Sequence, residues 1–338
     1  MDNTLFDTAD RLFAGLCTPA AIRAIESGGE VTPLWDALEE SGFGQALLPE
    51  AASGSGLALA DVWPVMFSAG RHAVPVPLGQ TMLARAWLHA AGRSIEHGSV
   101  TFAPFRVRRE GDHLIARGVS FGAVASWVLA ADGDAVWLLP TDEARVDQSG
   151  GHGSLDADLT WSLATADRAA LVGGMEIKIA DLQAVALAAL IAGAADRAFE
   201  MTLAYANQRV QFGKPIGKFQ ALQQQISEMA ELVFAARMAS QMACQGGGWY
   251  APPDLAHLAK GRTSQGVGRI VDVAHAVHGA IGVTHEYDLH LYTRRLNEWS
   301  RAGGGAGHWS RQLGQEALVS GQSAIDFIRC RLFGEPAV

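Results

Sequence analysis

The chain has 338 residues, of which 49% are hydrophobic and 18% are charged, so it can bury a substantial core without disulfide or metal support. Its formal charge of −9 at pH 7 disfavours a nucleic acid partner. Cys17, Cys244 and Cys330 lie far apart and show no metal or redox spacing, which predicts free thiols in a reducing compartment.

The N-terminal segment MDNTLFDTADRLFAGL has neither the basic start nor the uninterrupted apolar run of a signal peptide. The longest apolar stretch, residues 184–195, is shorter than the roughly twenty residues needed to span a bilayer and predicts a buried helix. We therefore expect a cytoplasmic protein with no membrane span.

The first part of the chain, residues 1–98, has a helical pattern. Leu34, Trp35, Leu38 and Phe43 recur at intervals of three to five residues, and Pro and Gly separate the stretches. The pattern predicts an N-terminal helical domain.

The middle part, residues 99–173, consists of short apolar segments such as SVTFAPF, HLIARGVSF, SWVLAAD and DAVWLLP. Turn sequences separate them, and the DGD at residues 132–134 predicts a β-hairpin. We expect a small β-rich domain that packs on helices, because strands of this length are not stable alone.

The last part, residues 174–338, has long helical stretches at 176–207, 219–245, 253–278 and 310–332. The first carries the small residues Ala186, Ala189, Gly193 and Ala194, which allow close helix contacts. The sequence thus predicts an α+β, mostly α protein with a C-terminal four-helix bundle.

Residues 207–225, NQRVQFGKPIGKFQALQQQ, connect two of these helices and have unusual chemistry for a linker. Arg209 offers a planar guanidinium suited to a pyrophosphate, Phe212 offers an aromatic face, and Gln211 and Gln220 can bind sugar hydroxyls or base edges. The alternative is structural, since an arginine in such a loop often caps helix carbonyls.

This segment resembles the RxQFGxPIGxFQxxQ signature of the acyl-CoA dehydrogenase family. A second segment, HAVHGAIGVTHEYDLHLYTRR at residues 275–295, is similar to another family motif, although Ala276 and Ala280 depart from it. A third, looser match lies in LWDALEESGFGQALLPEAASGSGLALADV. The three matches span most of the chain.

The resemblance implies an FAD-dependent enzyme that introduces an α,β double bond into an acyl-CoA and passes electrons to an electron-transferring flavoprotein. It also implies a dimer of dimers in which FAD is held across a subunit interface. The residues expected to hold its ADP half are Arg209, Gln211, Phe212, Gln220, His278 and Gly279.

The family needs a carboxylate to remove the proton at C2 of the thioester. Its two usual positions fall here at Gln183 and Gly303, and neither residue can accept a proton at neutral pH. The middle domain also lacks the TEPxAGSD-like loop of the family. The resemblance is therefore to the short non-catalytic subunits of heteromeric acyl-CoA dehydrogenases that act on fatty acid or steroid side chains.

In that hypothesis a longer, catalytic homologue supplies the base. Three alternatives stay open: a non-catalytic scaffold, a homo-oligomeric flavoenzyme with Glu298 or Asp181 as a displaced base, and an alignment gap that misplaces the two positions. A metal site is not expected, because His285, Glu286 and His290 do not match the HExxH spacing.

Overall fold

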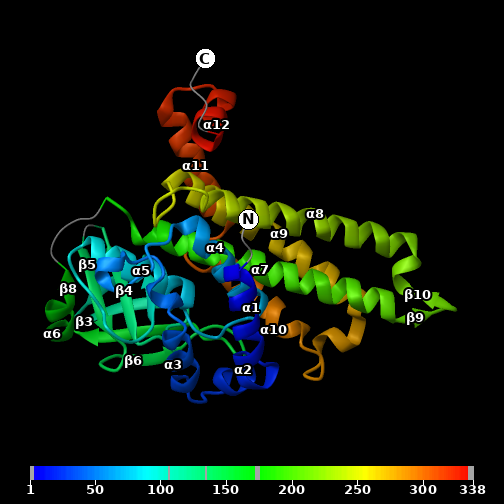
Figure 1. The fold of residues 1–338 in the computed structure, drawn as a ribbon, viewed down its shortest axis with the longest axis horizontal. Helices are drawn as coiled ribbons and strands as arrows, with labels where there is room; N and C mark the ends of the chain where they lie inside the picture. The colour runs from blue at the N-terminus through cyan, green and yellow to red at the C-terminus, as the bar shows by residue number, and fades with distance from the viewer. Residues whose placement is uncertain (1–3, 106, 134, 172–175, 334–338) are drawn as a thin grey trace.

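The computed structural model describes residues 4–105, 107–133, 135–171 and 176–333. Helices occupy both ends of the chain and strands lie between them (Figure 1), which confirms the predicted α+β, mostly α fold class. We propose domain limits of 1–98, 99–173 and 174–338. The limit at residue 173 lies outside the described residues.

The N-terminal part is helical, as predicted. Its elements are α1 (Thr4–Leu16), α2 (Pro19–Glu26), α3 (Thr32–Glu40), η1 (Phe43–Gln45), η2 (Glu50–Ala52), α4 (Leu59–Arg71) and α5 (Leu78–Ala90). Helix α2 begins with Thr18 as its N-cap, whose hydroxyl accepts a hydrogen bond from the Ala21 amide at 3.3 Å.

The middle part holds two four-stranded sheets, ordered β1-β4-β5-β8 and β2-β3-β7-β6. The strands are β1 (Val100–Ala103), β2 (Val107–Glu110), β3 (His113–Val119), β4 (Trp127–Asp132), β5 (Ala135–Pro140), β6 (Arg145–Gln148), β7 (Ala157–Ser162) and β8 (Ala170–Leu171), with α6 (Leu163–Ala169) before β8. Strands β4 and β5 pair antiparallel with Asp132 opposite Ala135, which confirms the predicted hairpin. Trp137 and Trp161 are among the residues of the core that the two sheets share.

The C-terminal part is helical and contains the small hairpin β9 (Val210–Gln211) and β10 (Lys214–Pro215). Its helices are α7 (Ile179–Gln208), η3 (Ile216–Lys218), α8 (Gln220–Ala243), α9 (Pro253–His278), η4 (Gly279–Val283), α10 (Leu289–Arg301), α11 (Ala306–Ser320) and α12 (Ala324–Phe333). The expectation of one helix over 310–332 was wrong. Gly321 adopts a φ of 67°, which ends α11, and the Ser323 hydroxyl caps the start of α12.

Helix α7 is the central element of the C-terminal part, packing on α4, α8, α9 and α10. By length and composition alone it could cross a membrane, but 89% of its most apolar window is buried inside the protein. This agrees with the buried helix predicted for residues 184–195. Contact with α4 is very close, because a Cβ atom on Gly193 would lie 2.0 Å from the Phe67 carbonyl oxygen.

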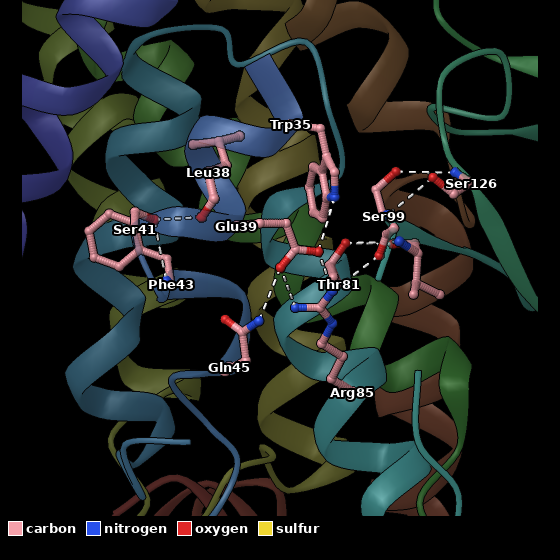
Figure 2. A network of polar contacts seen from close by, with 12 residues as sticks. Trp35, Leu38, Glu39, Ser41, Phe43, Gln45, Thr81, Arg85, Ser99 and Ser126 are labelled. Carbon is pink, nitrogen blue, oxygen red and sulfur yellow. Dashed lines mark hydrogen bonds and ion pairs between the residues drawn. The ribbon is translucent and has the colours of Figure 1, made fainter. Parts of the chain in front are cut away.

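A polar network joins the N-terminal helices to the first strand (Figure 2). Arg85, which is 3% exposed, donates hydrogen bonds to Glu39 and to the Gly98 carbonyl at 3.2 Å. Burial alone would raise the pKa of Glu39, but the hydrogen bond and charge of Arg85 hold it below its usual value. Thr81 exchanges hydrogen bonds with the backbone of Val100, so α5 sets the position of β1.

Candidate functional site

A cavity of about 780 Å³ lies where β1, the end of β3, α7 and the loop after α10 meet. Its polar lining consists of Arg117, Asp156, Gln183, Glu298, Arg301 and His308. Glycines form much of the remaining wall, namely Gly118, Gly150, Gly151, Gly303, Gly304 and Gly305. A wall of this kind lets a flat ligand approach the backbone closely.

Gln183 and Gly303 meet in this cavity. A Cβ atom on Gly303 would lie 2.8 Å from Oε1 of Gln183. Gln183 is 3% exposed, and its Oε1 accepts no hydrogen bond from any described residue. The two positions expected to carry a base therefore come together in space, and an unpaired amide oxygen stands there in place of a carboxylate.

Lys260 on α9 holds the loop that carries Gly303. Its buried ammonium group donates hydrogen bonds to the carbonyls of Trp299 at 2.9 Å, Ser300 at 3.1 Å and Gly304 at 3.2 Å. Burial lowers the pKa of Lys260 to about 7. The side chain thus satisfies carbonyls that the end of α10 leaves free and fixes the cavity wall.

Glu298 and Asp181, the two carboxylates considered as a displaced base, lie in different places. Glu298 lines the cavity, and its pKa is raised by burial even though Arg295 and Ser154 lower it. Asp181 is buried elsewhere, with Oδ1 3.0 Å from Nε2 of His257. Only Glu298, of these two, faces the candidate site.

The hairpin β9–β10 presents the predicted cofactor residues at the far end of α7 (Figure 1). Phe212 has a φ of 50° and is 91% exposed, while Arg209 and Gln211 beside it are also exposed. In the described part of the chain, no carboxylate pairs with the Arg209 guanidinium. Gln220 is exposed at the first position of α8, which follows the hairpin and η3.

His278 lies close to the start of this hairpin. Its ring stacks on Tyr205 of α7 at 4.5 Å, so the second motif lies beside the part of α7 that leads into the first motif. The side chain itself is buried: Nδ1 lies 2.7 Å from the Ala274 carbonyl and Nε2 lies 3.2 Å from the Tyr287 hydroxyl. Gly279 is exposed with a φ of 62° and offers its backbone to a ligand instead.

The cavity and the hairpin are distant from one another. From Gln183 to Gln208 along α7 the chain rises by about 38 Å, at about 1.5 Å per helical residue. The hairpin and the cavity of one chain therefore lie at opposite ends of a long stretch of α7.

The histidines of the second motif have separate partners. His275 Nε2 lies 3.0 Å from the Thr293 hydroxyl, and His290 Nδ1 lies 2.9 Å from the Tyr287 carbonyl. Among the residues that the structure describes, no three His, Cys, Asp or Glu side chains form a metal-binding group.

Sequence reasoning missed Asp156, Arg117 and His308 in the cavity lining. Asp156 precedes β7 in the segment GHGSLDADL, where it reads as an ordinary turn aspartate. Burial raises its pKa to about 7, and the negative charge of Glu298 adds to this. No sequence pattern could have shown that Asp156 and Glu298 line one cavity, because 142 residues separate them and they come together where the loop before β7 lies against α10.

The order of a helical region, a β-region and a helical bundle defines the fold class of acyl-CoA dehydrogenases. A solved structure described as a steroid ACAD variant of Tcur3481–Tcur3483 superposes with a TM-score of 0.80 at 25% identity, over 95% of this chain and 98% of the other. The ChsE4–ChsE5 complex from Mycobacterium tuberculosis gives 0.79 at 22% identity, over 95% and 98%.

Sequence comparison gives the same result. Residues 177–318 match the family model of the acyl-CoA dehydrogenase C-terminal domain. The acyl-CoA dehydrogenase IpdE2 of Mycobacterium tuberculosis is 32% identical over 87% of this chain and 90% of its own length. IpdE2 of Mycolicibacterium smegmatis is 31% identical over 87% and 91%. The chain belongs to the acyl-CoA dehydrogenase family, whose members are FAD-dependent oxidoreductases acting on CH–CH groups.

Proposed function

We propose that this chain is a subunit of a hetero-oligomeric acyl-CoA dehydrogenase and that a longer homologue supplies the catalytic carboxylate. The contact between Gln183 and Gly303 carries this proposal, because both family base positions converge there and neither residue ionises at neutral pH. The chemistry that a bound FAD would supply is acceptance of a hydride from C3 of the acyl group.

The residues near the hairpin fit the ADP half of that cofactor. Arg209 has an unpaired guanidinium suited to a pyrophosphate, and the exposed ring of Phe212 can cover an adenine or ribose. Gln211, Gln220 and the Gly279 backbone supply further polar groups. His278 is buried next to this surface and helps to position it by stacking on Tyr205.

The separation along α7 supports a cofactor shared between subunits. Because the hairpin lies about 38 Å from Gln183 along the helix, the flavin ring of an FAD held at Arg209 belongs in the cavity of a neighbouring subunit. This chain then contributes ADP binding to the site where the partner contributes the base.

The names of its relatives suggest a substrate class. The solved neighbours are a steroid ACAD and the ChsE4–ChsE5 complex, so we propose a bulky, steroid-derived acyl-CoA substrate for the assembly. We further propose a dimer of dimers in the cytoplasm that passes electrons to an electron-transferring flavoprotein.

Co-expression tests this function. The chain would be purified alone and together with a longer homologue that carries a glutamate at the position of Gln183 or Gly303. We expect the lone chain to be flavin-poor and unable to oxidise an acyl-CoA, and the complex to be yellow and active. Stoichiometric flavin and turnover from the lone chain would contradict the proposal.

Arg209→Ala in the complex separates this function from a scaffold role. Loss of flavin with the complex still assembled supports a working cofactor surface. Unchanged flavin content and turnover would instead favour a scaffold of the same fold.

A further inference from the structure

The cavity of this chain has a second acidic feature besides the neutral pair Gln183 and Gly303. Asp156, just before β7, and Glu298, on α10, both line it. Asp156 is half-buried, and Glu298 is 16% exposed at its side chain. Two carboxyl groups from different domains thus face the space next to the expected base positions.

The surrounding charges leave this pair incompletely neutralised. Glu26 on α2 accepts hydrogen bonds from Arg294 at 2.6 Å and from Arg295 at 3.0 Å. Glu298 has a longer contact of 3.7 Å with the Arg295 guanidinium and a hydrogen bond from the neutral Ser154 hydroxyl. The carboxyl groups of Glu26, Glu298 and Asp156 therefore share the guanidinium groups of Arg294 and Arg295. Burial and the negative charge of Glu298 both favour the protonated form of Asp156.

Other charged groups around the cavity do not remove this imbalance. The charged and titratable side chains that line it or form the adjoining network are Glu26 of α2, Arg117 of β3, Arg294, Arg295, Glu298 and Arg301 of α10, and His308 of α11. Among the described residues, neither Arg117 nor Arg301 forms an ion pair with Asp156 or Glu298. Arg117 instead contacts Asp158 at 3.4 Å.

We propose that Asp156 and Glu298 act together as an acid–base pair that removes a proton from C2 of an acyl thioester bound in the cavity of this chain. The ligand class rests on the proposed function, whereas the pair rests on the geometry of the cavity. This site differs from the one at the hairpin, where the chain serves the cavity of its partner.

The step balances without a redox partner. The C2–H bond breaks, its proton forms an O–H bond on the Asp156 carboxylate, and the electron pair moves to the thioester oxygen to give an enolate. Arg117, Arg301 and His308 supply donors in the same cavity for that oxygen. Return of a proton from the pair regenerates the thioester.

Deuterium exchange tests the proposal directly. The full chain would be incubated in D₂O with butyryl-CoA or 3-phenylpropionyl-CoA, and deuterium at C2 would be measured by mass spectrometry. If the chain folds only with its partner, the same assay is run on the complex. The partner's glutamate is then changed to glutamine, so that the partner's own base cannot cause the exchange. We expect exchange above the protein-free rate, rising with pH as the pair ionises.

Variants identify the groups responsible. Asp156→Asn and Glu298→Gln should each slow exchange by about 100-fold, the usual contribution of a general base. Asp147→Asn, at an exposed aspartate on β6 that pairs with Arg145, serves as the matched control and should exchange normally. Asp156→Glu should keep exchange but shift its pH profile, which a purely structural role would not do.

Two results overturn this inference: no exchange above background with either thioester, or equal rates in the wild type and folded Asp156→Asn. Exchange requires neither flavin nor an oxidant, so the assay is independent of the dehydrogenase test. An active complex without exchange would leave the proposed function intact and refute the pair. Exchange without an active complex would support the Asp156–Glu298 pair and contradict the proposed dehydrogenase function.

Discussion

Gln183 and Gly303 lie so close that a Cβ atom on the glycine would be 2.8 Å from the glutamine Oε1. Gly303 also has a φ of 60°, a backbone conformation that costs free energy for residues other than glycine. A side chain at position 303 would therefore strain the backbone and displace the end of the Gln183 side chain, whereas position 183 already carries a side chain of the size of glutamate.

We expect Gln183→Glu to fold and Gly303→Glu to be destabilised by about 1–3 kcal/mol, because a glutamate at position 303 would adopt a strained left-handed backbone conformation. In an Asp156→Asn background, Gln183→Glu should restore C2 exchange by placing a carboxylate in the same cavity. Denaturant unfolding and the exchange assay measure the two effects. A Gly303→Glu protein as stable as the wild type would show that the loop relieves the backbone strain at position 303.

Arg209→Ala should weaken flavin retention in the complex by about tenfold or more, because it removes charge-assisted hydrogen bonds to a pyrophosphate. Phe212→Ala should act in the same direction through lost ring contact. Both residues are exposed, so the melting temperature of the lone chain should not change. The ratio of flavin to protein absorbance after dialysis gives the result, with Arg11→Ala on α1 as the control.

Asp156 should make stability depend on pH. Its folded pKa of about 7 exceeds the ordinary aspartate value, so the folded state binds more protons than the unfolded state between about pH 4 and 7. The free energy of unfolding should therefore fall as pH rises through that range, by up to about 4 kcal/mol from this group. Asp156→Asn should lack this part of the decrease in denaturant titrations at pH 4.5 and 8. A wild-type pH dependence in the variant would argue against a raised pKa.

Lys260→Met should lower the free energy of unfolding by about 1–3 kcal/mol at pH 7, because it leaves buried carbonyls without a donor. The lowered pKa has a second consequence with the opposite slope. Between about pH 7 and 10 the unfolded lysine binds more protons than the folded one, so wild-type stability should rise with pH from this group. The variant should lose that rise, whereas Lys218→Met at an exposed site should keep it.

Gly193→Ala should destabilise the protein by about 3 kcal/mol or more, since the new methyl group would overlap the Phe67 carbonyl and force α4 away from α7. Gly268→Ala on α9 is the matched control. No atom lies within 4 Å of its added Cβ, so it should stabilise by about 0.5–1 kcal/mol through helix propensity. Thermal unfolding of the two variants would give shifts of opposite sign.

The sequence by itself determined the order of helical, β and helical regions, because apolar periodicity depends on local geometry. The hairpin at Asp132 followed from turn chemistry, and Gly193 followed from the need for close helix packing. One helix was predicted across Gly321, since a single glycine within a helical pattern does not reveal its φ.

Only the tertiary structure decided which side chains share the cavity. Asp181 and Gln183 lie two residues apart on α7, yet the first pairs with His257 and the second faces Gly303. Asp156 and Glu298 belong to different domains and line one cavity because the loop before β7 lies against α10, where Arg294 donates to the His152 carbonyl. Contacts between distant segments depend on how whole helices and sheets pack. A local pattern of residues along the sequence does not predict that packing.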